Sequence, residues 1–206
     1  VKYAMIDEQP AKALVKTISG VKVIDIPLTV EEYAFGVDKN QPQLLADINA
    51  VIAEIKANGT LTAIVEKYAT NSPDIAPIES ASFDASRADK QLVIATNAEF
   101  SPFEYKDGNK FAGIDMEIMK YVADKLGLEI VIMDMKFEAV VESVGKNGID
   151  IAVSGLTVNE KRKEFVNFTD TYYNASQLLI VAENDTSFDS CKTADDVIAV
   201  LEGKVK

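Results

Sequence analysis

Three apolar runs decide the fold class of this chain: LVIA at residues 92–95, IVIM at residues 130–133 and IDIAV at residues 149–153. Such short runs, apolar almost throughout, are typical of strands buried on both faces of a sheet. Between them, apolar residues recur at helical spacing over residues 114–126 and 137–144. Strands that alternate with helices in this way predict an α/β fold built on a mostly parallel sheet.

The segments that follow the three runs are the first place to look for a binding site. Ligands of parallel α/β sheets bind beyond the carboxyl ends of the strands. Those ends are residues 96–97, 135–137 and 154–157. We therefore expect these three segments to contribute to any ligand site.

The composition excludes several classes of function. The chain has 206 residues, of which 33 are acidic and 21 basic, and its formal charge is −12 at pH 7. Such a surface repels a phosphate backbone, so no nucleic-acid partner is expected. The chain lacks histidine, the commonest general base and metal ligand, and its single cysteine, Cys191, excludes an internal disulfide. No stretch approaches the roughly 20 apolar residues of a membrane helix, so no direct membrane span is expected.

The first 90 residues predict further strands and helices. The expected strands are residues 3–6, 21–24 and 33–37, and the expected helices are residues 10–18, 44–57 and 61–68. Residues 70–90 are rich in Ser, Ala, Asp and Pro and have little periodicity. We interpret them as a linker.

The two ends of the chain complement one another. Residues 194–201 predict a helix that ends at Gly203, and the remaining three residues lead towards a strand. The chain begins, from Val1, with such a strand. We therefore hypothesise that the sequence is circularly permuted, with residues 70–90 joining the original termini, and expect Val1 and Lys206 to lie close together.

Several longer motifs carry a family resemblance. The most specific are GLTVNEKR at residues 155–162 and VNFTDTYY at residues 166–173. They are preceded by IATNAEFSPFEY at residues 94–105, FAGID at 111–115, DMKF at 134–137 and GIDIA at 148–152. In order and spacing, residues 92–182 resemble the amino-terminal half of the periplasmic amino-acid-binding proteins of ABC transporters, the type II solute-binding family. Residues 1–69 resemble the carboxy-terminal part of that family, and this swapped order agrees with a permutation.

The resemblance implies a two-lobed α/β fold of the Venus flytrap type, with the ligand held in the cleft and a mostly parallel sheet in each lobe. On that template, lobe one is residues 34–69 and 91–174, lobe two is residues 1–30 and 177–206, and the hinge strands are residues 29–33 and 172–176. Between Asp185 and Lys192 the family carries a further strand, turn and helix. Lobe two is therefore expected to be truncated.

The resemblance also implies residues for an amino-acid ligand. Arg162 is expected to bind the carboxylate through its planar guanidinium, and Thr157 to add a hydroxyl and a backbone N–H. The carboxylate of Asp7 and the carbonyl oxygen of Gly155 are expected to accept hydrogen bonds from the ammonium group. Each residue also has a purely structural alternative. Arg162 stands in a basic run, Thr157 with Glu160 matches a helix capping box, and Asp7 and Gly155 suit turns.

Three more residues complete the expected site. Phe100 and Phe137 resemble the two aromatic walls that enclose the apolar body of the ligand in the family. Their alternative role is packing in the core. Asn97 stands where the family often contacts the ligand side chain, and it offers both a donor and an acceptor.

Together these features favour reversible binding of an amino acid, which the closed form delivers to the permease subunits of an ABC transporter. We expect a monomer that requires no cofactor and works in the periplasm or, lipid-anchored, at the cell surface. An enzyme on the same scaffold, such as a dehydratase, is the second candidate, but the chain has no nucleophile motif, metal-ligand cluster or glycine-rich phosphate loop. An engineered, permuted sensor derived from such a protein is the third.

Overall fold

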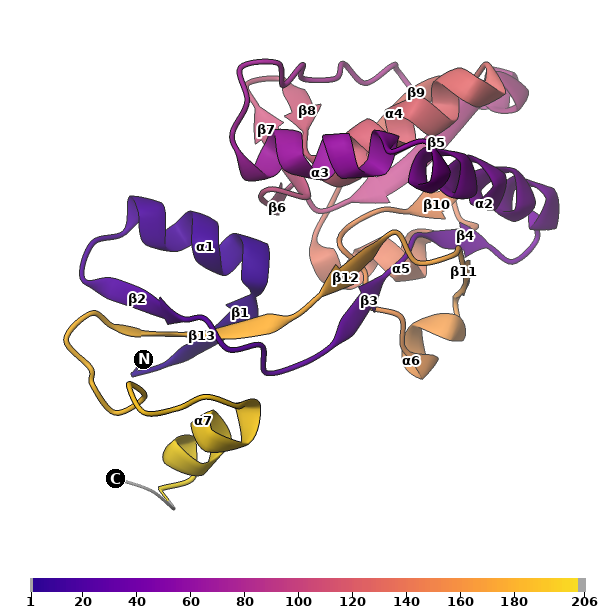
Figure 1. Ribbon diagram of the computed structural model, residues 1–206. Helices are drawn as coiled ribbons and strands as arrows, with labels where there is room; N and C mark the ends of the chain where they lie inside the picture. Colours follow the sequence, from indigo (N-terminus) through magenta and orange to yellow (C-terminus); the bar gives the residue numbers. More distant parts are fainter. Residues whose placement is uncertain (1, 204–206) are drawn as a thin grey trace. The chain divides into compact units, whose positions relative to one another are not determined.

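The computed structural model describes residues 2–203 and divides the chain into two compact units (Figure 1). Unit 1 comprises Val1–Glu31 and Asn174–Lys206, and unit 2 comprises Glu32–Tyr173. Each unit has a sheet of its own with helices packed on it. The predicted two-lobed α/β fold is confirmed. The expected proximity of Val1 and Lys206 concerns residues outside the described part of the chain.

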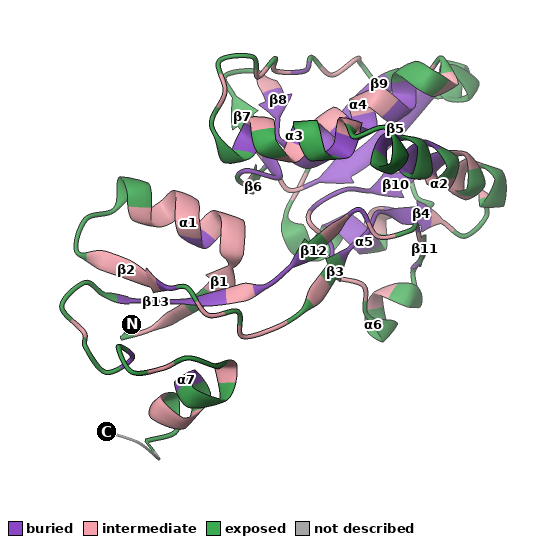
Figure 2. Cartoon of the chain, in the orientation of Figure 1, coloured by how far each residue is buried: buried purple, intermediate pink, exposed green. Residues whose placement is uncertain are grey.

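Unit 2 is built on a five-stranded sheet with the order β11-β4-β10-β5-β9. These strands are Val166–Phe168, Gly36–Asp38, Ile151–Ala152, Gln91–Thr96 and Glu129–Asp134, respectively. The pairs β10–β5 and β5–β9 are parallel, whereas β4 runs antiparallel to both of its neighbours. Every residue of β5 is buried, which agrees with its apolar sequence and its central place (Figure 2).

Helices enclose this sheet. Three of them, α2 (Pro42–Ala57), α3 (Thr60–Ala69) and α4 (Ile114–Leu126), pack on one another (Figure 1). The shorter α5 (Phe137–Ser143) places Val140 and Val141 in a cluster with Val93, Ala95 and Val131 of the sheet. Because side chains alternate along a strand, this cluster lies on one face of β5.

A small antiparallel sheet and an ordered segment extend unit 2. The sheet consists of β6 (Glu99–Phe100), β7 (Glu104–Asp107) and β8 (Lys110–Ala112). Within the segment predicted as a linker, Ile78 forms a bridge with Phe111, and the N–H of Ala81 donates to the carbonyl oxygen of Ile130 at 2.9 Å. The segment ends in a 3-10 helix, Ala85–Lys90. Residues 78–81 therefore pair with the outer strands β8 and β9.

Unit 1 has a three-stranded sheet with the order β1-β13-β2. Its elements are β1 (Ala4–Asp7), α1 (Glu8–Thr17), β2 (Val21–Ile24), β13 (Gln177–Ala182) and α7 (Ala194–Leu201). Helix α1 packs on the face of Leu178 and Ile180, and α7 packs on the face of Leu179 and Val181. Residues 183–193 connect β13 to α7.

The expectation of a mostly parallel sheet in each lobe is wrong for unit 1. Both strand pairs in this sheet, β1–β13 and β13–β2, are antiparallel. Helix α1 connects β1 to β2, so these two strands run in the same direction. Strand β13, which comes from far along the chain, lies between them and runs in the opposite direction. An apolar strand sequence predicts burial but not the direction of the neighbouring strand.

The chain passes between the units at two short strands, β3 (Glu31–Tyr33) and β12 (Tyr173–Ala175), which pair with one another. The single strand expected at residues 33–37 is instead two strands, β3 and β4. Between them, the N–H of Ala34 donates to Leu156 O and the N–H of Phe35 donates to the Thr169 hydroxyl. Because residues 34–35 bond to these other partners, they pair with neither flanking strand, and the chain is divided into β3 and β4 at this point.

Gly113 sets the start of α4 against β7. Its φ of +132° lies in a region that side chains rarely adopt, and a Cβ at this position would lie 2.0 Å from the carbonyl oxygen of Phe103. The first N–H groups of α4, on Ile114 and Asp115, donate to Pro102 O and Phe103 O at 2.9 and 3.0 Å. This close approach of two backbones requires glycine.

We expect Gly113→Ala to lower the free energy of unfolding by more than the roughly 0.5–3 kcal/mol of ordinary substitutions, because the clashing atoms belong to the backbone. Gly127→Ala is the matched control, since Gly127 also has positive φ, +68°, but open space around it. That substitution should cost only about 1–2 kcal/mol. Urea denaturation measures both, and equal losses would contradict this explanation of Gly113.

Candidate functional site

The candidate site is centred on the loop that follows β10 in unit 2, residues 153–157. The N–H of Val153 donates to Ala95 O at 2.8 Å, and the N–H of Ala34 donates to Leu156 O at 3.1 Å. Thr157 forms a bridge with Tyr33. Backbone bonds on both sides therefore hold this loop at the carboxyl end of the parallel strands, where the sequence placed a site.

A buried network of acids lies behind the loop. The Asp115 carboxylate accepts hydrogen bonds from the N–H of Gly155 at 2.9 Å and the hydroxyl of Tyr172 at 2.6 Å. The hydroxyl of Ser154 donates to the Glu104 carboxyl at 2.9 Å. Both acids are fully buried. The loop is thus attached to two carboxyl groups in the interior.

Burial raises the pKa of both acids. The pKa of Asp115 rises to about 7, although the hydrogen bonds from Tyr172 and Gly155 act in the opposite direction. The pKa of Glu104 rises well above its usual range, first through burial and then through the negative charge of Asp115. Burial, and then the charge of Asp115, raise the pKa of Tyr172 as well.

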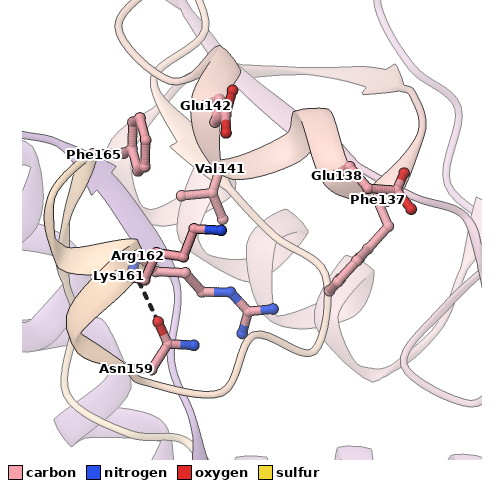
Figure 3. Close-up of a pocket in the computed structure, with 8 residues that line it drawn as sticks. All are labelled: Phe137, Glu138, Val141, Glu142, Asn159, Lys161, Arg162 and Phe165. Carbon is pink, nitrogen blue, oxygen red and sulfur yellow. Dashed lines mark hydrogen bonds between the residues drawn. The ribbon is translucent and has the colours of Figure 1, made fainter.

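Arg162 stands on the short helix α6 (Glu160–Lys163) and is oriented by three contacts. Asn159 caps the helix, since its side chain accepts from the N–H of Arg162 at 2.9 Å. The Nη1 atom of Arg162 donates to the carbonyl oxygen of Thr157 at 2.8 Å. Its guanidinium carbon lies 5.4 Å from the centre of the Phe137 ring, and Figure 3 shows the two side chains pointing toward one another. This distance suits a cation–π interaction.

A cavity of about 460 Å³ lies beside Arg162 (Figure 3). Its described lining residues are Phe137, Glu138, Val141, Glu142, Asn159, Lys161, Arg162 and Phe165. Two cations, two acids and two aromatic rings therefore surround one space. Such a set can hold a small molecule that carries charges of both signs on an apolar body.

Phe100 of β6 and Asn97, which follows β5, are two further predicted residues of the site. A Cβ on Gly155 would approach Phe100 Cε1 to 3.0 Å, so the ring packs directly on the glycine. Phe100 also stacks on Phe103, with ring centres 5.6 Å apart. The amide of Asn97 donates to the carbonyl oxygen of Met135 at 3.0 Å, which joins the loop after β5 to the loop after β9.

Asp7 belongs to unit 1, where it ends β1 and directly precedes α1. Gln177 Nε2 donates to its carboxylate at 3.3 Å. Burial raises the pKa of Asp7, and the bond from Gln177 opposes that shift. A half-buried acid of this kind is a suitable acceptor for a cationic group.

The structure thus brings Arg162, Thr157 and Phe137 together. Gly155 lies in the same loop as Thr157, Phe100 of β6 packs on Gly155, and Asn97 stands in the loop after β5. The alternative role of Thr157 as the cap of a helix is wrong, because α6 begins at Glu160 and Asn159 caps it.

The acid network was not anticipated from the sequence. Its only signal is an acid next to apolar residues: Glu104 directly follows Phe103, and Asp115 stands between Ile114 and Met116. The same pattern occurs at many exposed positions.

Two other features concern metal ions and membranes. Among residues 2–203, no group of three or more His, Cys, Asp or Glu side chains is arranged to hold a metal ion. Across the same residues, every helix is too short or too polar to cross a membrane.

Known proteins share the sequence of this region. Residues 92–202, more than half of the chain, match the family described as bacterial extracellular solute-binding proteins, family 3. The arginine-binding extracellular protein ArtP of Bacillus subtilis is 38% identical over 103 residues, which are 50% of this chain and 40% of that protein. A probable histidine-binding protein of Campylobacter jejuni is 30% identical over 113 residues, 55% of this chain and 41% of that protein.

Among solved structures, the arginine-bound form of domain 1 from TmArgBP is 28% identical with a TM-score of 0.40, and the match covers 59% of this chain and 99% of that domain. The chain spans about 40% of the length of the curated relatives named above.

The cap of α6 provides a test of how Arg162 is oriented. We expect Asn159→Ala to lower the free energy of unfolding by about 1 kcal/mol, because the N–H of Arg162 loses its acceptor. Asn159→Asp keeps an acceptor at the same position and serves as the control. Thermal denaturation of the two variants measures these losses of stability. An equal loss of stability in Asn159→Ala and Asn159→Asp would show that Asn159 does not act as the cap.

Proposed function

This chain belongs to the bacterial extracellular solute-binding proteins of family 3, and we propose that it binds an amino acid through Arg162 of unit 2. One observation carries the proposal: the Arg162 guanidinium lies between the Thr157 carbonyl oxygen and the Phe137 ring and borders a cavity of about 460 Å³. This orientation prepares a planar cation for a carboxylate. A cavity of this size suits an amino acid.

The carboxylate of the ligand would bind the forked guanidinium and the hydroxyl of Thr157. An arginine can contact both oxygens of a carboxylate at once, and a hydrogen bond between charged groups is about twice as strong as a neutral one. The contact with Thr157 O fixes the plane of the guanidinium beforehand, so less side-chain entropy is lost on binding.

The rest of the ligand would contact groups of opposite character. Phe137 and Phe100 offer apolar rings for its body, and Asn97 offers an amide to its side chain. The carbonyl oxygen of Gly155 is the proposed acceptor for its ammonium group in unit 2. In unit 1, the half-buried carboxylate of Asp7 is the proposed acceptor for a cationic group. Pairing both charges of the ligand is necessary, because a buried charge without a partner is costly.

A cationic amino acid, arginine first, is the favoured ligand. Glu138 and Glu142 line the cavity beside Arg162 and can accept a guanidinium or an ammonium group. The formal charge of −12 attracts cations over a longer range. The names of the relatives from Bacillus subtilis and Campylobacter jejuni, an arginine-binding protein and a probable histidine-binding protein, support the same class.

We further infer that the protein binds without turnover and hands its ligand to the permease subunits of an ABC transporter. The family description and the names of the relatives support this role outside the cytoplasm. A monomer in the periplasm, or anchored by a lipid at the cell surface, suits it.

Arginine at about a hundredfold excess over its Kd should stabilise the folded protein by about 2.7 kcal/mol, because the ligand binds only the folded state. Agmatine, which has the same guanidinium but no carboxylate, is the matched control and should give no shift. Thermal shift measurements with both compounds and with the twenty amino acids test the proposal. Equal shifts for arginine and agmatine would contradict a carboxylate site at Arg162.

Substitution of Arg162 should separate binding from folding. We expect Arg162→Ala to weaken arginine binding by about a hundredfold, because a charged hydrogen-bond donor is removed. Arg162→Lys should be intermediate, since an ammonium group lacks the planar fork of a guanidinium. Lys163→Ala, at an exposed position one residue away, is the control and should bind normally. Asp7→Asn should weaken binding by about tenfold through loss of the negative charge.

Isothermal titration calorimetry gives these Kd values, and near-UV circular dichroism reports whether each variant is folded. Normal affinity in a folded Arg162→Ala variant would rule out this site.

A further inference from the structure

The two buried acids behind the candidate site lie close enough to interact with one another. The N–H of Asp115 donates to the carbonyl oxygen of Phe103, the residue before Glu104, at 3.0 Å, and the two carboxyl groups bind the consecutive residues Ser154 and Gly155. Burial raises the pKa of Glu104, and the negative charge of Asp115 raises it further. Because the charge of Asp115 raises the pKa of Glu104, a proton that remains when Asp115 ionises is held on Glu104, with Asp115 as its nearest acceptor. Among the described residues, the Glu104 Oε2 atom is buried and has no hydrogen-bond partner while both acids are ionised. A proton on Oε2, donated to Asp115, accounts for its position.

The surroundings of the pair favour a single negative charge. Two adjacent buried carboxyl groups cannot both ionise at neutral pH without a large cost. In the part of the chain that the structure describes, the printed hydrogen bonds to the two carboxyl groups come from Tyr172, Ser154 and the N–H of Gly155, and none of these is a cation.

We propose that Glu104 and Asp115 share one proton, held on Glu104, and that this acid pair is the positioning device that keeps residues 154–155 in their ligand-contacting conformation. The inference rests on the proposed function of that loop in amino-acid binding. Glu104 accepts from the hydroxyl of Ser154, and Asp115 accepts from the N–H of Gly155, so each acid fixes one of the two residues. Fixing the N–H of Gly155 also orients the neighbouring peptide groups of the loop.

The location of the proton gives the two acids different requirements. Glu104 acts as a neutral donor and acceptor, which an amide can reproduce. Asp115 acts only as an acceptor, from Tyr172, Gly155 and Glu104. An asparagine at residue 115 would place an NH₂ group against at least one of these donors, and a buried donor would lose its partner.

The test compares Glu104→Gln with Asp115→Asn by titration calorimetry with arginine at several pH values between about 5 and 9, a range around the value near 7 for Asp115. At neutral pH, Glu104→Gln should bind within about threefold of the unsubstituted chain, and Asp115→Asn should bind at least about tenfold more weakly. Glu66→Gln, an exposed acid of unit 2, is the matched control and should change nothing.

The pH dependence of arginine affinity and of stability separates the proposal from a simple packing role. If Glu104 and Asp115 only filled space, their substitution would not change this pH dependence. Because the folded-state pKa of each acid is raised, the stability that the pair contributes is complete below the ordinary carboxyl range and falls as pH rises through about 7. Glu104→Gln removes one of the two titrations and supplies a permanent donor to Asp115. Both its affinity and its stability should therefore vary less with pH than those of the unsubstituted chain.

Tyr172→Phe provides a second variant that keeps the ring, which stacks on Phe35 at 4.2 Å between centres. It removes one hydrogen bond to the Asp115 carboxylate, so the midpoint of the pH profile should move to higher pH. This variant decides the question if Asp115→Asn does not fold.

Three results would overturn the proposal: Glu104→Gln binding as weakly as Asp115→Asn, a pH profile unchanged in Glu104→Gln, or a midpoint unmoved in Tyr172→Phe. Urea denaturation without ligand over the same pH range forms an independent arm. If the unsubstituted chain binds no amino acid, the proposed function fails. The pH dependence of the stability of Glu104→Gln and Tyr172→Phe, measured without ligand, then still shows whether the two acids share a proton.

Discussion

The carboxylate of Asp115 joins three parts of unit 2 that are distant in the sequence. It stands at the start of α4, accepts from Gly155 in the loop after β10 and accepts from Tyr172 next to the crossing strand β12. Since the group is buried, each lost partner would leave an unsatisfied polar atom in the interior. The geometry of the loop, of the helix start and of the chain crossing therefore depends on one acceptor.

The backbone around Asp115 is as restricted as its side chain. Gly113 brings the first turn of α4 against Phe103, and this approach places Glu104 and Asp115 side by side. The side chains proposed to contact the ligand are less constrained than this buried pair. Arg162 lies on a helix of four residues, and Phe137 is 42% exposed. The arrangement combines a rigid, buried support with accessible side chains, which suits a site that must bind and release a small molecule.

Much of this organisation could be predicted from residue patterns. The apolar runs at residues 92–95 and 130–133 form parallel neighbours in the sheet, and the helix expected from Ile114 begins there. The motif at residues 155–162 contains both the loop and Arg162. The antiparallel sheet of unit 1 could not be predicted, because the position of β13 between β1 and β2 depends on a pairing across more than 150 residues.

The sequence by itself determined the α/β class, the family and the candidate residues Arg162, Thr157 and Phe137, since periodicity and motifs are local properties of a chain. Tertiary structure alone decided that Asn159 rather than Thr157 caps α6, that the Arg162 guanidinium lies over Phe137, and that Glu104 meets Asp115 beneath Gly155. The physical reason is that hydrogen bonds and pKa shifts depend on distances in space and on the exclusion of water. Neither of these can be read from the order of residues along the chain.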